Sequence, residues 1–393
     1  MRTSAKQALR EFRAPDETGA EERAWTTVRS AYLEREPVPV RRRRARPAIR
    51  LATAPIAALL IAGLLLSPAG ASVRRLITYA LGERRASPAL SSLPSPGRIL
   101  VSGGGGTWSV AADGSTRHVG AWRQASWSPH GLFLAVSSGD RLAAVDPRGE
   151  VRWVIDRPSI SDPRWFSPSG YRVAYLSAGT LRVIAGDGTG DHLLANAVAG
   201  VAPAWRPGHP YELAYVTDRG SIVVRDADTG RLLWSTPPGP QVRGLIWSSD
   251  GRRLFVVCAH AGRIYTGGGS LRAWLDWPGH TSAGDAALSP DGRTLAVVVD
   301  HDQVVALPTD MRTPATRQLL TGAGLGDVSW SPDGRWLLVS WPAADQWVFL
   351  RMDGPPHVTA VSRIKQQFSS GGVAARGFPQ LDGWCCTAAG QAG

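Results

Sequence analysis

A short motif recurs along the chain at intervals of about 40 residues. In each copy a large apolar residue precedes a turn sequence and an apolar run follows it, as in Ser329–Trp341, SWSPDGRWLLVSW. Ser, Pro, Asp and Gly are the residues that a tight turn favours, and the following run is rich in strand-forming residues. The copies begin at Trp127, Phe166, Trp205, Trp247, Leu288 and Trp330, which gives intervals of 39, 39, 42, 41 and 42 residues. A period near 40 with this content is typical of a β-propeller, in which each repeat forms one four-stranded blade.

The two ends of the repeat region complement each other. Arg98–Gly120 has the pattern of a second, third and fourth strand with no first strand before them. Leu381–Cys386, which contains Trp384, has the pattern of a first strand with no successor, and Gln366–Phe378 reads as an insertion before it. We therefore predict an all-β, seven-bladed β-propeller over residues 98–386 that the C-terminal strand closes, since a closed ring leaves no free edge between its ends.

The apolar residues that begin the copies are predicted to pack one blade against the next. Trp buries a large area between stacked sheets, and 15 of the 16 Trp residues lie between Trp108 and Trp384. A ligand-stacking cage is the alternative. The predicted structural anchors of the seven blades are Trp127, Phe166, Trp205, Trp247, Leu288, Trp330 and Trp384.

The positive charge of the chain is concentrated before the repeats. The net charge is +12, yet residues 86–393 hold 27 Lys or Arg against 24 Asp or Glu. Residues 1–50 hold 13 against 7. Because the repeat region is nearly neutral, we expect no nucleic-acid partner for it.

The segment Leu51–Val73 contains no charged residue. About 20 apolar residues cross the hydrocarbon core of a membrane, so residues 51–72 are predicted to form a single transmembrane helix. Six arginines between Arg41 and Arg50 precede it and only Arg74 and Arg75 follow, which predicts residues 1–50 inside and the propeller outside the cytoplasmic membrane. A signal peptide cleaved at Ala69–Ala71 and a buried soluble helix are the alternatives.

The flanks of this segment have simpler patterns. Ala20–Glu36 shows helical periodicity, which predicts an amphipathic helix in a basic cytoplasmic tail over residues 1–50. Residues 73–97 are expected to form a juxtamembrane helix and a Pro/Ser linker, and residues 387–393 a disordered tail. The cytoplasmic helix binds a partner, lies on the membrane surface beside its arginines, or has no specific role.

The repeat resembles that of TolB-type β-propellers, which is also found in the propeller part of prolyl-oligopeptidase-like enzymes. The likeness rests on the Trp-Ser-Pro-Asp-Gly turn and the apolar strand after it, and it covers Arg98 to Cys386. It implies a fold and not a function. WD-repeat proteins share the period, but the Trp-Asp dipeptide is absent here. Asp226–Trp234, DADTGRLLW, is similar to the repeat of propellers that bind pyrroloquinoline quinone, with Val145–Trp153 as a weaker match.

The motifs of common catalytic and metal sites are absent from the sequence. There is no Gly-x-Ser-x-Gly, and the eight His residues show no metal-ligand spacing such as His-Glu-x-x-His. We therefore predict no catalytic residues, no cofactor-binding residues, no metal ligands and no enzyme activity.

The cysteines leave several possibilities open. Cys385 and Cys386 are adjacent, and Cys258 is the third cysteine. Neighbours on one strand point to opposite faces, so each of the pair would be ordinary small packing. Outside the cytoplasm, a disulfide within the pair or to Cys258 is the alternative. A vicinal disulfide lies beside the cofactor in dehydrogenases that use pyrroloquinoline quinone, which is the one likeness to an enzyme.

The function expected from these patterns is a membrane-anchored, extracytoplasmic scaffold of the bacterial cell envelope. The ring would bind a protein or envelope ligand on one face without catalysis. The alternative is a transmembrane signalling regulator, similar in layout to membrane-anchored anti-sigma factors, with the propeller as its sensor. A remote alternative is an enzyme that uses pyrroloquinoline quinone.

Overall fold

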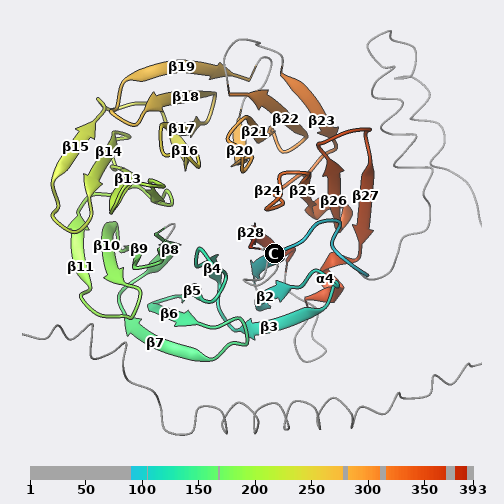
Figure 1. The fold of residues 1–393 in the computed structure, drawn as a ribbon, viewed down its shortest axis with the longest axis horizontal. Helices are drawn as coiled ribbons and strands as arrows, with labels where there is room; N and C mark the ends of the chain where they lie inside the picture. Colours follow the sequence, from blue (N-terminus) through green and yellow to red (C-terminus); the bar gives the residue numbers. More distant parts are fainter. Residues whose placement is uncertain are drawn as a thin grey trace, which may run out of the picture. The chain divides into compact units, whose positions relative to one another are not determined.

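Seven four-stranded antiparallel sheets surround a central axis in the computed structural model (Figure 1). The structure describes residues 90–386 except 104, 167–168, 278–281, 310–315 and 369–376. The predicted all-β, seven-bladed propeller is therefore confirmed. The predicted tail 1–50, transmembrane segment 51–72, terminal residues 387–393 and most of the segment 73–97 lie outside the described residues. Among the described residues no helix has the length and apolar character needed to cross a membrane.

Each blade is a sheet of four strands, with the first strand innermost except where the closing blade uses the last strand of the chain. The first blade contains β4 (Gln124–Trp127), β5 (Leu134–Ser138), β6 (Arg141–Val145) and β7 (Val151–Asp156). The second contains β8 (Ile160–Trp165), β9 (Arg172–Ser177), β10 (Thr180–Ala185) and β11 (His192–Ala195). The third contains β12 (Ala204–Trp205), β13 (Glu212–Val216), β14 (Ile222–Asp226) and β15 (Leu232–Ser235).

The remaining blades follow the same order. The fourth contains β16 (Val242–Trp247), β17 (Arg253–Cys258), β18 (Ala261–Thr266) and β19 (Leu271–Asp276). The fifth contains β20 (Ala283–Leu288), β21 (Thr294–Val299), β22 (Gln303–Pro308) and β23 (Arg317–Thr321). The sixth contains β24 (Val328–Trp330), β25 (Trp336–Trp341), β26 (Gln346–Arg351) and β27 (Val358–Ser362), with the 3-10 helix η2 (Pro342–Ala344) and the helix α4 (Ile364–Gln367) beside them. The closing blade contains β28 (Gln380–Cys385), β1 (Arg98–Gly103), β2 (Gly106–Val110) and β3 (Thr116–Gly120).

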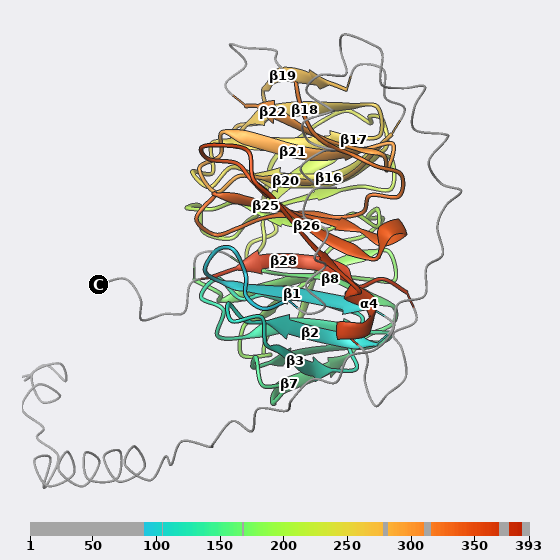
Figure 2. The same ribbon diagram turned by 90° about the vertical axis from the view of Figure 1, so that its right-hand side faces the viewer.

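The ring closes as predicted, through the last strand of the chain. Strand β28 pairs antiparallel with β1, with Trp384 opposite Ile99 and Leu381 opposite Val101. Figure 2 shows β28, β1, β2 and β3 as neighbouring strands of one sheet. Pairing the two ends removes the free edges that an open ring would expose.

Apolar residues run without interruption along the second strands because both faces of each strand are buried. In β21, Leu295, Val297 and Val299 face a core shared with the fourth blade. Ala296 and Val298 face another core, shared with the sixth blade. Successive side chains of a strand point to opposite faces, so a sheet packed on both sides needs a continuous apolar run.

The recurring turn is held by its own Ser and Asp side chains. Ser331 Oγ donates to Asp333 Oδ1 at 2.6 Å and accepts a hydrogen bond from the Trp336 N–H at 2.9 Å. Gly334 has a φ of 70°, a conformation that residues with a Cβ rarely adopt. The same pair of hydrogen bonds recurs in the turns that begin at Ser248 and Ser289. The motif thus has an architectural role.

Two segments differ from their sequence-based expectations. Leu90 and Leu93, at the end of the predicted linker, are buried in the core between the sixth and closing blades. The start of the predicted insertion contributes to that core as well. Phe368 is 1% exposed and its ring lies near Trp108 and Trp347, with centroid distances of 6.1 Å and 5.4 Å. Large apolar side chains draw both segments onto the ring.

The anchor of the second blade is displaced by one residue from its predicted position. Trp165 pairs with Val173 on the next strand, as Trp127 pairs with Leu134 and Trp247 with Leu254. Phe166 lies just beyond β8 and packs on Trp205 of the third blade, as its predicted packing role requires, whereas Trp165 takes the register position of the other anchors. The turn of this blade is one residue longer, and only the strand register shows which aromatic residue takes the inner position.

Candidate binding sites on the turn face

The turns between first and second strands, and those between third and fourth strands, lie at the same end of the antiparallel blades. We call this end of the ring the turn face. It carries two pockets: a channel-mouth pocket at the centre and an arginine pocket between the closing and first blades.

The channel-mouth pocket has a volume of about 460 Å³. Its lining includes four of the predicted anchors, Trp127, Leu288, Trp330 and Trp384, together with the charged side chains of Arg164 and Asp382. The anchors therefore contribute to a pocket wall as well as to packing between blades.

Three anchor tryptophans also form hydrogen bonds from one blade to the preceding one. The indole N–H of Trp205 donates to the Arg164 carbonyl at 2.9 Å, and that of Trp247 donates to the Ala204 carbonyl at 3.1 Å. Trp330 donates to the Ala287 carbonyl at 3.0 Å. In contrast, the buried indole nitrogens of Trp127, Trp165 and Trp384 have no hydrogen-bond partner within the part of the chain that the structure describes.

Carboxylates enter the channel from irregular positions on the innermost strands. The pairing register shifts between Ser161 and Arg164 in β8 and between Ala283 and Ala286 in β20, and β28 shifts at Asp382. A β-bulge re-aims the extra side chain, and the extra residues here include Asp162, Asp285 and Asp382. Asp327 directly precedes β24.

Two of these carboxylates connect consecutive blades. Asp285 Oδ2 accepts a hydrogen bond from the Val328 N–H, and Asp327 Oδ2 accepts one from the Leu381 N–H, both at 2.9 Å. Gln124 Oε1 accepts the Asp162 N–H at 2.8 Å in the same manner. Each bond satisfies a backbone donor of the next innermost strand, so these side chains stabilise the ring.

The channel environment favours the protonated form of these aspartates. Burial raises the pKa of Asp382 to about 8, and the nearby Asp327 and Asp162 charges add to the shift, whereas Ser102 and Arg164 oppose it. Burial and the charge of Asp327 raise the pKa of Asp285 to about 7. The Asp285 side chain is nonetheless solvent-exposed, and contact with water favours its charged form. Burial also raises the pKa of Asp327.

Among the described residues, no group of three or more His, Cys, Asp or Glu side chains is placed to hold a metal ion. The cluster of channel aspartates is best understood as part of the connection between blades.

The cysteine pair lies where the ring closes. The structure joins Cys385 and Cys386 by a disulfide, whereas Cys258 is a buried free cysteine on the fourth blade. Cys386 Sγ lies 3.3 Å from the Pro129 carbonyl oxygen of the first blade. Of the alternatives that the sequence left open, the structure contains the disulfide within the pair.

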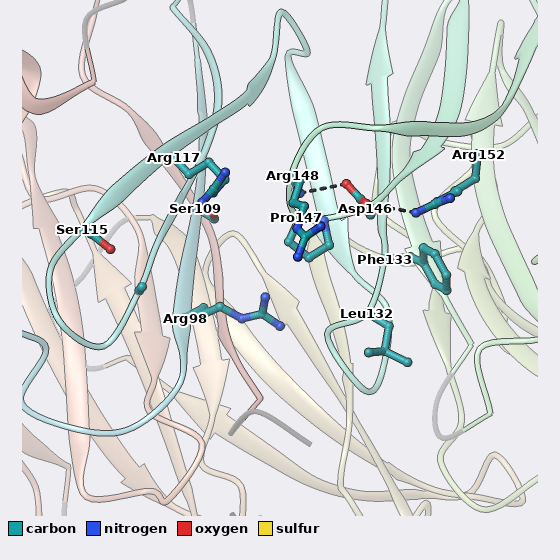
Figure 3. A pocket seen from close by; sticks show the side chains of 11 residues that line it. Arg98, Ser109, Ser115, Arg117, Leu132, Phe133, Asp146, Pro147, Arg148 and Arg152 are labelled. Atoms are coloured by element: carbon teal, nitrogen blue, oxygen red, sulfur yellow. Dashed lines mark hydrogen bonds and ion pairs between the residues drawn. The ribbon is translucent and has the colours of Figure 1, made fainter. Parts of the chain in front are cut away.

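The arginine pocket lies between the closing and first blades and has a volume of about 500 Å³ (Figure 3). Four arginines and one aspartate provide its charged lining: Arg98, Arg117, Arg148, Arg152 and Asp146. The Asp146 carboxylate is already engaged, because it accepts hydrogen bonds from Arg152 Nη2 and from the backbone N–H groups of Arg148 and Glu150. The pocket therefore has an excess of positive charge.

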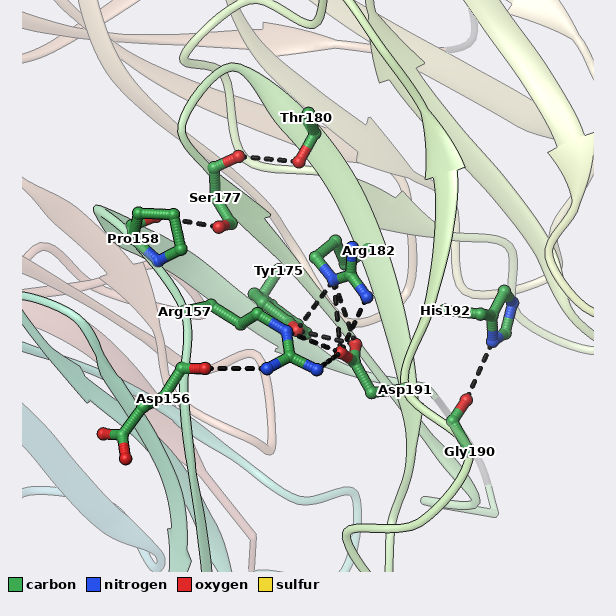
Figure 4. Close-up of polar contacts among 10 residues, drawn as sticks. All are labelled: Asp156, Arg157, Pro158, Tyr175, Ser177, Thr180, Arg182, Gly190, Asp191 and His192. Atoms are coloured by element: carbon green, nitrogen blue, oxygen red, sulfur yellow. Dashed lines mark hydrogen bonds and ion pairs between the residues drawn. The ribbon is translucent and has the colours of Figure 1, made fainter.

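A second cluster of charges, around Asp191 on the second blade, is internally satisfied (Figure 4). Asp191 Oδ2 accepts hydrogen bonds from Arg157 Nη2 at 2.6 Å and Arg182 Nη2 at 2.8 Å, and Oδ1 accepts the Tyr175 hydroxyl at 2.7 Å. Burial alone would raise the pKa of Asp191, but the hydrogen bonds from Arg182, Tyr175 and Arg157 lower it. Because both arginines already bind the one carboxylate and the tyrosine hydroxyl is engaged as well, this network has a structural role and is a poor candidate for a binding site.

The sequence motifs indicated neither pocket. The channel aspartates come from strands far apart in the chain, and no sequence pattern predicts that they lie close together. The arginine pocket left one signal, the turn Asp146–Gly149, DPRG, which has an arginine where Asp226–Gly230, DADTG, has its second aspartate.

The geometry places the chain in the class of seven-bladed β-propellers. No family model matches the chain, and none of the curated proteins is similar to it. Among solved structures, it is similar to the Cps50 (Swd1) β-propeller domain of Myceliophteria thermophila. That match has 12% identity and a TM-score of 0.50, and it covers 61% of this chain and 85% of the other. This likeness shows the fold alone.

Hydrazine synthase of Kuenenia stuttgartiensis is also similar in structure. The identity is 16% and the TM-score 0.49, over 58% of this chain and 76% of that chain.

Proposed function

We propose that this protein is a non-catalytic scaffold that binds a protein or envelope ligand on the turn face of its propeller. The observation that carries the proposal is the gathering of two pockets and exposed apolar side chains on that face. Leu132 is 57% exposed, Phe133 37% and Tyr171 64%, and all three lie in turns between first and second strands. Exposed apolar residues beside pockets are typical of surfaces that bind proteins.

A photo-crosslinking amino acid tests the choice of face. It replaces Tyr171 on the turn face of the full-length chain, or Arg219, an exposed residue of the turn between β13 and β14 at the opposite end of the blades. We expect cross-linked adducts in cells from the Tyr171 position and none from the Arg219 position. Adducts from Arg219 alone, or from neither position, would contradict the proposal.

The proposal includes attachment to the cytoplasmic membrane by one helix, with the propeller on the extracytoplasmic side. Its support is the uncharged segment 51–72 and the arginines before it. Arg219→Cys adds an exposed thiol to the ring, which a membrane-impermeant maleimide should label in intact cells. Labelling that requires lysis of the cells would exclude this topology.

A further inference from the structure

On the turn face, an ionic contact joins the second and third blades. The arginine that begins the second strand of one blade faces the turn between the third and fourth strands of the next blade. Between the second and third blades, Arg172 Nε and Nη2 donate to the two carboxylate oxygens of Asp228, both at 2.9 Å. This bidentate pair, typical of Arg with a carboxylate, raises the pKa of Arg172.

The same two positions between the closing and first blades are Arg98 and Arg148. Arg98 directly precedes Ile99, which pairs with the anchor Trp384, as Arg172 precedes Val173, which pairs with Trp165. The equivalence of Arg148 and Asp228 follows from the turns in which they lie.

Two turns have the same backbone hydrogen bond. The Arg148 N–H binds Asp146 Oδ1 at 2.8 Å, and the Asp228 N–H binds Asp226 Oδ1 at 3.0 Å. Arg148 therefore occupies the place of Asp228, and an arginine faces Arg98 where the third blade supplies a carboxylate to Arg172.

With an arginine in place of an aspartate, the positive charges of Arg98, Arg117 and Arg148 are not neutralised by any described residue. Arg98 Nη2 donates to the Gly131 carbonyl at 2.5 Å and its guanidinium lies 4.6 Å from the Trp127 ring centroid, but no described carboxylate pairs with it. Burial lowers its pKa, the reverse of the shift in Arg172. The exposed side chains of Arg117 and Arg148 form no ion pair in the described part of the chain.

Apolar groups border these arginines. Leu132 and Phe133 line the same pocket, and Figure 3 shows the arginine side chains of Arg98, Arg117 and Arg148 around one space with Leu132 and Phe133 at its side. A concave site with several guanidinium groups, of which that of Arg98 is held by Gly131, suits a single inserted anionic side chain, whereas the apolar border suits a neighbouring apolar residue.

We propose that the arginine pocket binds a carboxylate side chain of a protein partner, presented beside an apolar residue that packs on Leu132 and Phe133. This inference rests on the proposed function, since it names the partner chemistry of the same face. A carboxylate is favoured because the fold itself places one, that of Asp228, at the equivalent position of another blade pair. The carboxylate of the partner would thus form the ion pair with Arg98 that no described residue of the chain forms.

The decisive variant supplies the missing carboxylate from the chain itself. Arg148→Asp places a carboxylate opposite Arg98, as Asp228 lies opposite Arg172, and Arg148 is exposed, so the fold should persist with an unchanged or higher melting temperature. Arg272→Asp changes the net charge equally on the exposed outer strand β19 and is the matched control.

Binding is measured by fluorescence polarisation of labelled peptide pools on the purified full-length protein. One pool of octapeptides has a central Glu-Leu with randomised flanks, and the other has Gln-Leu. We expect the Glu pool to bind at least about 10-fold more tightly, and Arg148→Asp to weaken it about 10- to 100-fold, the range for hydrogen bonds to a charged group. Arg272→Asp should bind as the wild type does.

Three outcomes would overturn the inference: no binding of the Glu pool, equal binding of both pools, or no effect of Arg148→Asp. Binding to phosphatidylglycerol vesicles without binding to the Glu pool would assign the pocket to a membrane surface and overturn it as well. If the cross-link from Tyr171 nevertheless persists in Arg148→Asp, the turn face still binds a partner and only the carboxylate assignment fails. Absence of that cross-link in the wild type would mean that the proposed function itself is wrong.

Discussion

At the scale of single residues, side chains at equivalent positions of the repeat differ in the hydrogen bonds that they form. Trp330 and Trp384 are both buried anchors, 7% and 6% exposed, at the same register position of neighbouring blades. Only Trp330 donates an indole hydrogen bond to the preceding blade, whereas the Trp384 indole nitrogen has no partner among the described residues. A pair of identical substitutions can therefore separate the hydrogen bond from the packing.

Trp330→Phe should lower the free energy of unfolding by about 1 kcal/mol more than Trp384→Phe does. Both changes remove the same atoms, but only the first leaves a buried carbonyl, that of Ala287, without its donor. Chemical denaturation of the two variants measures the difference. Equal losses would mean that the bond adds nothing to packing.

At the scale of elements, the closing strand is the one that joins the two ends of the ring. Strand β28 supplies Leu381 and Trp384 to the core between the sixth and closing blades, and its backbone covers the edge of β1. Without it, that core would be open to water and β1 would present unpaired N–H and C=O groups.

Truncation before Gln380 should therefore abolish the cooperative unfolding transition or lower the melting temperature sharply. The matched control ends after Cys386, which keeps all of β28. Calorimetry and dye binding to exposed apolar surface report the outcome. A truncated chain that melts as the control does would show that the ring does not depend on this closure.

At the scale of the whole molecule, the channel joins aspartates from blades far apart in sequence. Asp382 has a pKa of about 8 in the folded chain, well above the value of about 3.9 for an unfolded aspartate. The folded chain therefore binds more protons than the unfolded chain between these pH values. The stability that this group contributes is fully present below about pH 4 and is lost as the pH rises through about 8.

Asp382→Asn removes this titration. From about pH 5 to about pH 9, the melting temperature of the wild type should fall relative to that of the variant, because the wild type alone must ionise a buried carboxyl. Asp218→Asn, which removes an exposed carboxylate at the edge of the ring, serves as the control and should follow the wild type. Parallel profiles for wild type and Asp382→Asn would contradict the assignment.

The number of blades and the closure of the ring could be read from the sequence by itself. Both follow from local chemistry: turn residues and apolar runs recur with a fixed period, and each repeat buries its strands against the next in the same way. The terminal halves of one blade are recognisable for the same reason, since Arg98–Gly120 lacks the strand that Leu381–Cys386 supplies. The sequence does not show what the residues that depart from the repeat contact in the folded ring.

Only the tertiary structure decided what those departures mean. In the second blade Trp165 takes the register position of the anchors and Phe166 packs against the third blade, although either aromatic fits the local pattern. Whether Arg98 has a carboxylate partner depends on the residue at position 148, which lies on the neighbouring blade but 50 residues later in the chain. Charge pairing acts through space between blades, so it is determined by the folded ring, whereas periodicity acts along the chain and is visible in the sequence.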